Sequence, residues 1–195
     1  MRSKSHLGKK VVDAVHAAGS SIVVQLEHAG ALSQGNRFKS QNLAPSEVLP
    51  KGEPLAFYGG AESFSTPIAA TKEDIEEVIR GFVAPAVRAK SVGFDDVEIH
   101  GANGYLLDQF LTDYTNRRTD EYGGSIENRI RLLVEVATAI RQAVGPDFTV
   151  GIEISQAKVN DYQHKWSGKE DEAEVIFMQL RQAGLDYRER GICKS

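Results

Sequence analysis

The sequence contains a single cysteine, Cys193, so an internal disulfide framework is excluded. The thiol stands close to the end of the chain without a histidine nearby, and we interpret it as a bystander rather than a nucleophile. No apolar run is long enough to span a bilayer, and residues 1–10 lack the apolar core of a signal peptide. These absences predict a protein of the reducing cytoplasm.

An excess of basic residues is also lacking. The chain has 23 Lys and Arg against 27 Asp and Glu, and the basic residues are scattered. Proteins that bind nucleic acid or anionic membranes usually carry a basic patch, so neither partner is predicted. No spacing of ligand residues indicates a metal site. No repeat or shift in composition marks a second domain, and we expect residues 1–195 to form one domain.

Apolar periodicity predicts an alternation of helices and strands. The expected helices cover residues 7–18, 71–90, 126–144 and 170–183. The expected strands cover residues 21–26, 96–100 and 148–155, and a fourth begins at 184–187. Pro85 is expected to kink or break the second helix. This alternation, with a long loop after the first strand (residues 27–70), predicts parallel βα units of a TIM (β/α) barrel whose loops build an active site.

The predicted barrel is incomplete. A whole (β/α)₈ barrel usually needs about 250 residues, whereas this chain of 195 residues shows only a few strands. The polar residues 188–195 are expected to form an atypical tail rather than a strand. We therefore expect the first and last strands to be missing. The strand edges of such a fragment would be unpaired, which predicts either a truncated product or self-association as a homo-oligomer.

Alternation along the strand at 96–100 predicts which side chains face the barrel interior. Val97 and Ile99 are apolar and should pack against helices, which leaves Glu98 and His100 facing inward. Gln25 ends the preceding strand on the same rim, where a neutral amide suits a flavin pyrimidine edge or an amide substrate. A satisfied core glutamine is an equally good interpretation of Gln25.

His100, Asn103 and Tyr105 lie at or just after the carboxyl end of this strand. Histidine and asparagine side chains can both donate hydrogen bonds to one carbonyl or nitro oxygen, and so stabilise developing enolate charge as an oxyanion hole does. A nearby tyrosine can deliver a proton as a general acid. We favour this catalytic interpretation over a structural histidine and a core tyrosine, because the three residues follow one another at a strand end.

Three other features have weaker signals. His28 is interpreted as a loop-packing residue, and the polar segment 108–131 as a scaffold for the rim. Glu98 and Glu153 leave open a hydrolase with a carboxylate pair across the lumen, since paired carboxylates with separated pKa values can perform acid–base catalysis.

The segments VEIHGANGYLLDQFL and TNRRTDEYGGSIENRIRLL resemble the hallmark stretch of the Old Yellow Enzyme family of FMN-dependent ene-reductases. VVQLEHAGA and VGIEISQAKVNDY are similar to two further strands of that family, and the likeness covers residues 7–187. The resemblance implies an FMN-containing TIM barrel. In that family the flavin takes hydride from NADH or NADPH and passes it to the β-carbon of an electron-poor alkene.

The resemblance also implies residue roles. His100 and Asn103 would bind the substrate's carbonyl or nitro oxygen, Tyr105 would donate a proton to the α-carbon, and Gln25 would contact the flavin. Glu153 stands where the family usually has an arginine or lysine beside the flavin, which exchanges a cation for a carboxylate. Family members also have a tryptophan at the position of Glu27 and an arginine at that of Ala31. The strands that would grip the FMN phosphate are not visible in the sequence.

The leading prediction is an FMN-dependent NAD(P)H oxidoreductase that reduces activated C=C bonds of small α,β-unsaturated carbonyl or nitro compounds. The alternative is a catalytically inactive barrel fragment that self-associates or pairs with another chain.

Overall fold

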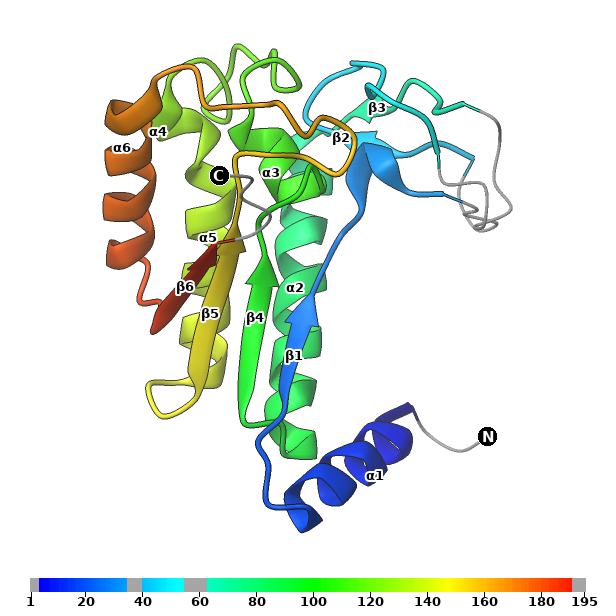
Figure 1. Ribbon diagram of the computed structural model, residues 1–195, viewed down its shortest axis with the longest axis vertical. Coiled ribbons are helices and arrows are strands. Elements are labelled where there is room, and N and C mark those ends of the chain that lie inside the picture. Colours follow the sequence, from blue (N-terminus) through cyan, green and yellow to red (C-terminus); the bar gives the residue numbers. More distant parts are fainter. Residues whose placement is uncertain (1–3, 35–39, 55–62, 191–195) are drawn as a thin grey trace.

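A four-stranded parallel sheet forms the centre of the protein, with the strands in the order β1–β4–β5–β6 (Figure 1). The computed structural model describes residues 4–34, 40–54 and 63–190, and the backbone alone of residues 4–6 and 188–190. The strands are β1 (Val23–Leu26), β4 (Asp96–His100), β5 (Thr149–Ile154) and β6 (Tyr187–Arg190). The parallel βα arrangement predicted from the sequence is confirmed. Cys193 lies outside the described residues.

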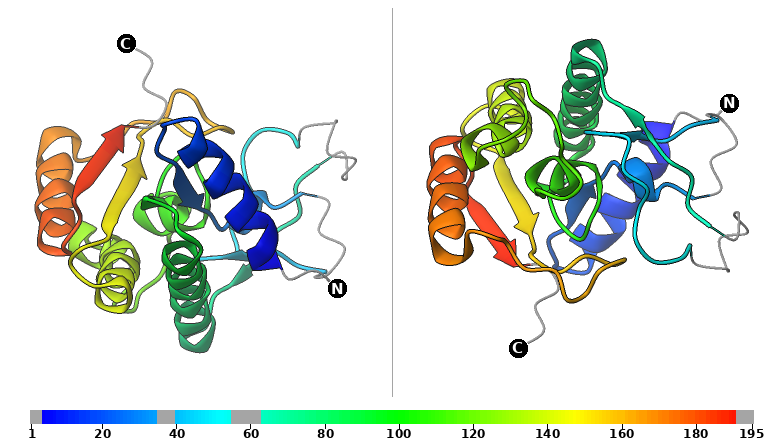
Figure 2. Two further views of the ribbon diagram at one scale, coloured as in Figure 1. Left: turned by 90° about the horizontal axis from the view of Figure 1, so that it is seen from below. Right: turned by 90° about the horizontal axis from the view of Figure 1, so that it is seen from above.

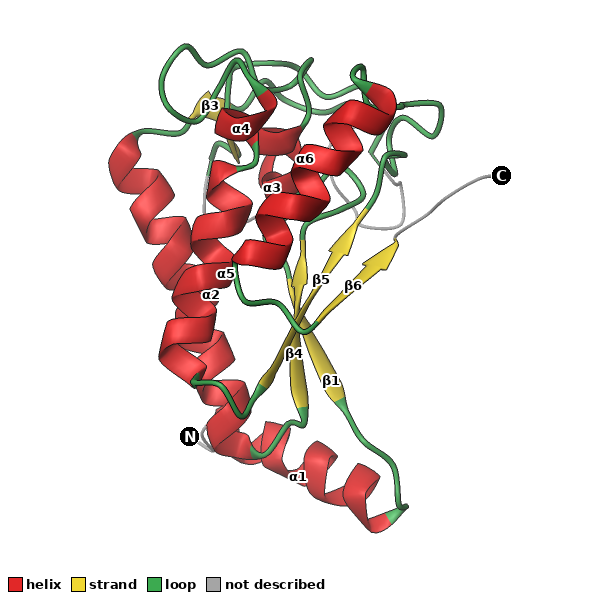
Figure 3. Cartoon of the chain, turned by 90° about the vertical axis from the view of Figure 1, so that its left-hand side faces the viewer, coloured by secondary structure: helices red, strands yellow, loops and turns green. Residues whose placement is uncertain are grey.

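The long helices cover one face of this sheet, and the other face carries no helix layer in the part of the chain that is described (Figure 3). The covering helices are α2 (Lys72–Val92), α5 (Arg131–Val144) and α6 (Lys169–Gln182). Helix α1 (Lys4–Ala17) lies across the amino ends of the strands (Figure 1). Seen along the strands, α6, α5 and α2 follow one another around one side, as in a segment of a barrel wall (Figure 2). None of the described helices is both long and apolar enough to cross a membrane.

The alternation of side chains in the strands explains why one face is covered and the other is polar. Val97 and Ile99 in β4 are fully buried in the core that the sheet forms with the helices, as predicted. Val150 and Ile152 in β5 belong to the same core. The intervening positions lie on the opposite face, where Gly151 gives room to a neighbouring ring, because a Cβ atom there would lie 2.1 Å from Cζ of Tyr187.

Of the kink or break expected at Pro85, a break is absent, since α2 runs without interruption from Lys72 to Val92. A proline within a helix removes one hydrogen bond and crowds the carbonyl four residues earlier. That earlier residue is Gly81, which carries no side chain. The buried Phe82 and Ala86 on either side of Pro85 hold both halves of α2 against the core, and this packing outweighs the lost hydrogen bond.

The helix predicted over 126–144 is divided into α4 (Ile126–Arg129) and α5, with Ile130 between them. Arg129 anchors α4 to neighbouring parts of the core. Its guanidinium is buried, donates 2.8 Å to the carbonyl of Leu111 and forms an ion pair with Glu172 of α6.

The segment after β1 and the end of the chain hold more regular structure than the sequence indicated. Within 27–70, η1 (Gly30–Leu32) forms one 3₁₀ turn, and β2 (Leu43–Ala44) pairs in parallel with β3 (Ile68–Ala69). The tail expected at 188–195 begins as a strand, because β6 continues to Arg190. Backbone pairing with β5 accounts for this, since ladder hydrogen bonds do not require apolar side chains.

Candidate active site at the carboxyl ends of the strands

The loop after β4 is held in place by the loop after β5. Asn103 has a left-handed backbone (φ 60°), which asparagine tolerates better than most residues. Its N–H donates to Oγ of Ser155 at 2.7 Å, and its carbonyl accepts from the N–H of Val159 at 3.0 Å. Both Asn103 and His100, at the end of β4, are buried. The backbone therefore presents these two side chains at fixed positions on the rim.

A buried ion pair also holds the loop after β4 in place. Nζ of Lys158 lies 2.7 Å from Oδ1 of Asp108, and neither side chain is more than 1% exposed. Oδ2 of Asp108 also accepts from the N–H of Gly104 at 2.6 Å, and Gln109 donates to the Gly104 carbonyl at 2.7 Å. Sequence reasoning did not single out Lys158, because a lysine in a polar loop carries no periodic signal of burial. The role of Asp108 agrees with the scaffold interpretation of 108–131.

Glu153 on β5 is the point at which the predicted site residues converge. Nδ2 of Asn103 donates to Oε1 of Glu153 at 3.1 Å, and Nε2 of Gln25 donates to Oε2 at 2.8 Å. Nδ1 of His100 lies 2.8 Å from the same Oε2. The register explains the convergence, because His100 and Glu153 are directly paired across β4 and β5.

His100 retains hydrogen-bonding capacity within this cluster. Neither ring nitrogen meets hydrogen-bond geometry with any group that the structure describes, although Nδ1 is close to Glu153. A buried polar group without a hydrogen bond is costly, and such groups mark sites that a ligand can satisfy. Tyr105 lies beside His100, with 5.2 Å between the ring centroids.

The hydrolase interpretation is not supported by the contacts of its two carboxylates. Nε2 of Gln25 donates to Oε1 of Glu98 and to Oε2 of Glu153, both at 2.8 Å. An amide thus occupies the space between the carboxyl groups, where a hydrolytic pair would hold the bond to be cleaved. His28 has a local role, since its Nδ1 accepts from the N–H of Gly30 at 3.1 Å.

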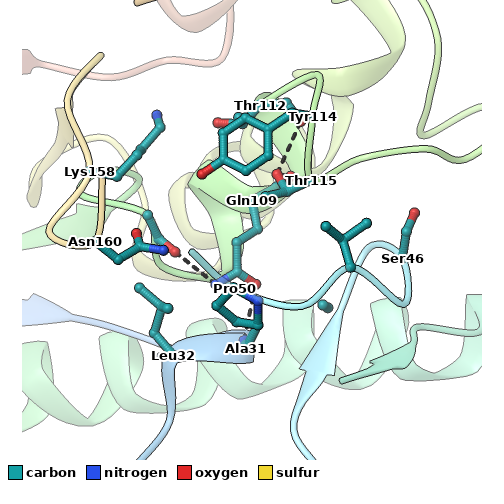
Figure 4. Close-up of a pocket in the computed structure, with 13 residues that line it drawn as sticks. Ala31, Leu32, Ser46, Pro50, Gln109, Thr112, Tyr114, Thr115, Lys158 and Asn160 are labelled. Atoms are coloured by element: carbon teal, nitrogen blue, oxygen red, sulfur yellow. Dashed lines mark hydrogen bonds between the residues drawn. The ribbon is translucent and has the colours of Figure 1, made fainter. Parts of the chain in front are cut away.

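The open hollow beside Tyr105 and Glu27 has a volume of about 360 Å³ and is also lined by Leu32, Val159 and Tyr162. This volume lies within the usual range for small-molecule sites. A second cavity, shown in Figure 4, lies between Leu32, Gln109 and Tyr114. It has only about 20 Å³, room for one water molecule, and burial raises the pKa of Tyr114 to about 12. The hollow beside Tyr105 is therefore the better candidate for a substrate.

Arg118 ties the long loop to the rest of the rim. Its Nη1 donates to the carbonyls of Pro45 at 3.1 Å and of Ala70 at 2.6 Å, so the carboxyl ends of β2 and β3 are both held. The other side of the guanidinium binds Asp120, with Nε 3.0 Å from Oδ1. This hydrogen bond from Arg118 holds the pKa of the Asp120 carboxyl below its ordinary value.

A lowered pKa in the folded state predicts how Asp120 contributes to stability. The contribution is present above the unfolded pKa of about 4 and is lost as the pH falls through the folded pKa. We expect Asp120→Asn to lower the free energy of unfolding by about 1 kcal/mol at pH 7, because the pair is partly exposed. Urea titrations of both proteins at pH 7 and pH 3 measure this difference. A difference that does not shrink at pH 3 contradicts the assignment.

Comparison with known proteins places this chain in a family. The family model described as "NADH:flavin oxidoreductase / NADH oxidase family" matches residues 3–187. The chain belongs to this family. Two relatives with flavin-dependent names illustrate the similarity. A flavin oxidoreductase of Emericella nidulans is 45% identical over 148 residues, which are 75% of this chain and 37% of the relative. A probable flavin mononucleotide-dependent alkene reductase of Leishmania infantum is 43% identical over 157 residues, 75% of this chain and 42% of the relative.

Solved structures of this oxidoreductase family share the fold. An Old Yellow Enzyme homologue from Zymomonas mobilis superposes with a TM-score of 0.87 at 29% identity, covering 97% of this chain and 53% of the other. Morphinone reductase in complex with tetrahydroNAD gives a TM-score of 0.85 at 36% identity, covering 97% of this chain and 54% of the other. The fold is thus part of an Old Yellow Enzyme TIM barrel, and the chain spans about half the length of these proteins or less.

The rim fits one charge state of the family's flavin and opposes another. Gln25 keeps its amide oxygen as an acceptor, which suits the N–H of a flavin pyrimidine ring. Its Nε2 donates to two carboxylates, those of Glu98 and Glu153. The described partners of Glu153 are His100 and two amides, without a lysine or arginine. A ring that gains negative charge would be repelled by this carboxylate, so the described residues fit a neutral flavin better than an anionic one.

Proposed function

We propose that this chain carries the substrate-binding rim of an FMN-dependent NAD(P)H oxidoreductase that reduces the activated C=C bonds of α,β-unsaturated carbonyl or nitro compounds. One observation carries the proposal. His100 and Asn103 are buried donors fixed beside each other at the carboxyl end of β4, and the His100 ring nitrogens lack hydrogen bonds with the described protein groups. Family membership supports the flavin and the nicotinamide donor.

The proposed roles follow from the chemistry of each side chain. His100 and Asn103 donate to the substrate's carbonyl or nitro oxygen and stabilise the negative charge that grows there. Tyr105, beside His100 and open to the hollow, gives a proton to the α-carbon. The flavin, when bound, supplies the hydride that the β-carbon receives. One hydride and one proton together saturate the C=C bond.

The test combines flavin binding with turnover. The purified chain is mixed with FMN, freed of unbound flavin by gel filtration, and examined by visible absorbance. It is then given NADH or NADPH with 2-cyclohexen-1-one or 1-nitrocyclohexene under anaerobic conditions. We expect bound flavin and alkene-dependent oxidation of the nicotinamide. In a His100→Ala, Asn103→Ala variant, we expect flavin binding to be unchanged and the oxidation to be slower. A chain that takes up no FMN contradicts the proposal.

A second candidate is an inactive barrel fragment that pairs with a copy of itself or with another chain. The sheet supports it, because β1 and β6 are the two edge strands of the described sheet and each has a ladder partner on one side only. Size-exclusion chromatography with light scattering decides between the two. A flavin-free dimer that becomes monomeric when proline replaces the exposed Val23, whose N–H points away from β4, supports pairing through that edge, whereas a flavin-free monomer contradicts it.

A further inference from the structure

We propose that the carboxylate of Glu153 is an internal ligand of the His100–Asn103 pair and decides which oxygen ligands the rim accepts. The inference deepens the proposed function, because it concerns the same pair of donors. Its geometry, however, requires no flavin. In this assignment an acceptor ligand reaches the pair only by displacing Glu153.

The contacts show that Glu153 already stands in the acceptor position. Oε1 accepts from Nδ2 of Asn103 at 3.1 Å, and Oε2 lies 2.8 Å from Nδ1 of His100, a close contact that lacks hydrogen-bond geometry. These are the two side chains that would hold a substrate oxygen. Gln25 fixes the carboxylate from the third side, with its Nε2 2.8 Å from Oε2. One carboxylate therefore contacts both groups of the oxygen-binding pair.

This contact is built into the fold. His100 and Glu153 are register partners in β4 and β5, and their side chains are only 5% and 15% exposed. The backbone of Asn103 is fixed by Ser155 on the N–H side and by Val159 on the carbonyl side. Neither donor is on a flexible exposed segment, so the pair meets Glu153 whenever the sheet is formed.

A second carboxylate, that of Glu27, also favours neutral ligands over anionic ones. Oε2 of Glu27 lies 3.9 Å from Nε2 of His100, and its side chain is 41% exposed beside the hollow. An entering anion meets Glu27 and must then replace Glu153, and both steps bring like charges together. The rim thus rejects carboxylates, phenolates and nitronates, while a neutral carbonyl or nitro oxygen competes with Glu153 at a disadvantage.

Chemical rescue by acetate tests this assignment. Glu153→Ala removes the internal carboxylate and leaves space for a carboxylate of similar size. The ring resonances of His100 are followed by NMR during titration with acetate in the wild type and the variant, and are assigned by their loss in His100→Ala. We expect acetate to bind Glu153→Ala about tenfold to hundredfold more tightly than the wild type, the worth of a hydrogen bond to a charged group.

Two further variants sharpen the test. Glu27→Ala removes the more distant and more exposed carboxylate, and we expect a smaller gain in acetate affinity than for Glu153→Ala. Glu153→Gln keeps the side-chain shape, and its neutral oxygen competes less strongly than a carboxylate, so the gain is expected here too, but smaller. Glu153→Gln decides the matter if Glu153→Ala does not fold. Acetate affinities equal to the wild type in the folded Glu153 variants overturn the proposal.

The two proposals fail in distinguishable ways. Acetate binding is measured without flavin, so an FMN-loaded chain that reduces no alkene overturns the proposed function and leaves this inference standing. A wild-type chain that binds acetate as tightly as its Glu153 variants, yet reduces enones, overturns this inference alone.

Discussion

Replacing Lys158 with methionine is expected to lower the free energy of unfolding by about 3–5 kcal/mol. Methionine keeps much of the side-chain volume but removes the cation, which leaves Asp108 buried with its charge uncompensated. Asp108 has 0% side-chain exposure and its remaining partners are the Gly104 N–H and the Thr112 hydroxyl. Urea or guanidinium titration followed by circular dichroism measures the loss.

Two controls separate the loss of charge pairing from the substitution itself. Lys9→Met removes a cation from an ion pair that is more than half exposed on both sides, and we expect a change below about 0.5 kcal/mol. Lys158→Met combined with Asp108→Asn removes both charges and keeps an oxygen for the Gly104 N–H, so most of the lost stability should return. A single-variant loss under about 1 kcal/mol would show that the pair is not buried as described.

Replacing Tyr105 with phenylalanine is expected to reduce alkene reduction by the FMN-loaded chain about a hundredfold to ten-thousandfold, the usual contribution of a general acid. This prediction rests on the proposed function. Phenylalanine keeps the ring beside His100 and removes only the hydroxyl group that would donate the proton. Stopped-flow absorbance separates flavin reduction by NAD(P)H from flavin oxidation by the alkene, and only the second step should slow.

Tyr162 provides the matched control for this substitution, because it lines the same hollow and is 50% exposed. Tyr162→Phe should slow flavin oxidation far less than Tyr105→Phe, because the Tyr162 hydroxyl has no part in the proposed proton transfer. If Tyr105→Phe slows flavin reduction as much as flavin oxidation, the hydroxyl supports the structure of the rim and does not donate the proton.

The fold could be predicted where the sequence pattern is regular. Alternation in β4 placed Val97 and Ile99 on the helix side, and both are fully buried there. Loop lengths placed the polar residues at the carboxyl ends of the strands. Pro85 shows the limit of local rules, because buried neighbours along α2 hold the helix together across the proline. The strand at the end of the chain shows the same limit, since β6 forms by pairing with β5 despite its polar sequence.

The candidate site could be predicted as a set of residues but not as a set of contacts. Position in the strands and loops indicated Gln25, His100, Asn103 and Tyr105. The structure brings the first three together around Glu153 and places Tyr105 beside His100. The resemblance showed that Glu153 places a carboxylate where the family usually has a cation. That its carboxylate contacts the oxygen-binding pair depends on the register between β4 and β5 and on side-chain rotamers. Neither is encoded in a local pattern.

The strands lie in the sheet in the same order as they occur along the chain, from β1 to β6. A polypeptide emerging from the ribosome can therefore add one strand at a time to a sheet whose existing edge is already in place. The donors on β1 and β4 are synthesised before β5 supplies Glu153. A nascent chain that ends before β5 thus displays His100 and Asn103 without their carboxylate, and the arrival of β5 completes the sheet and fills the oxygen-binding position in a single docking event.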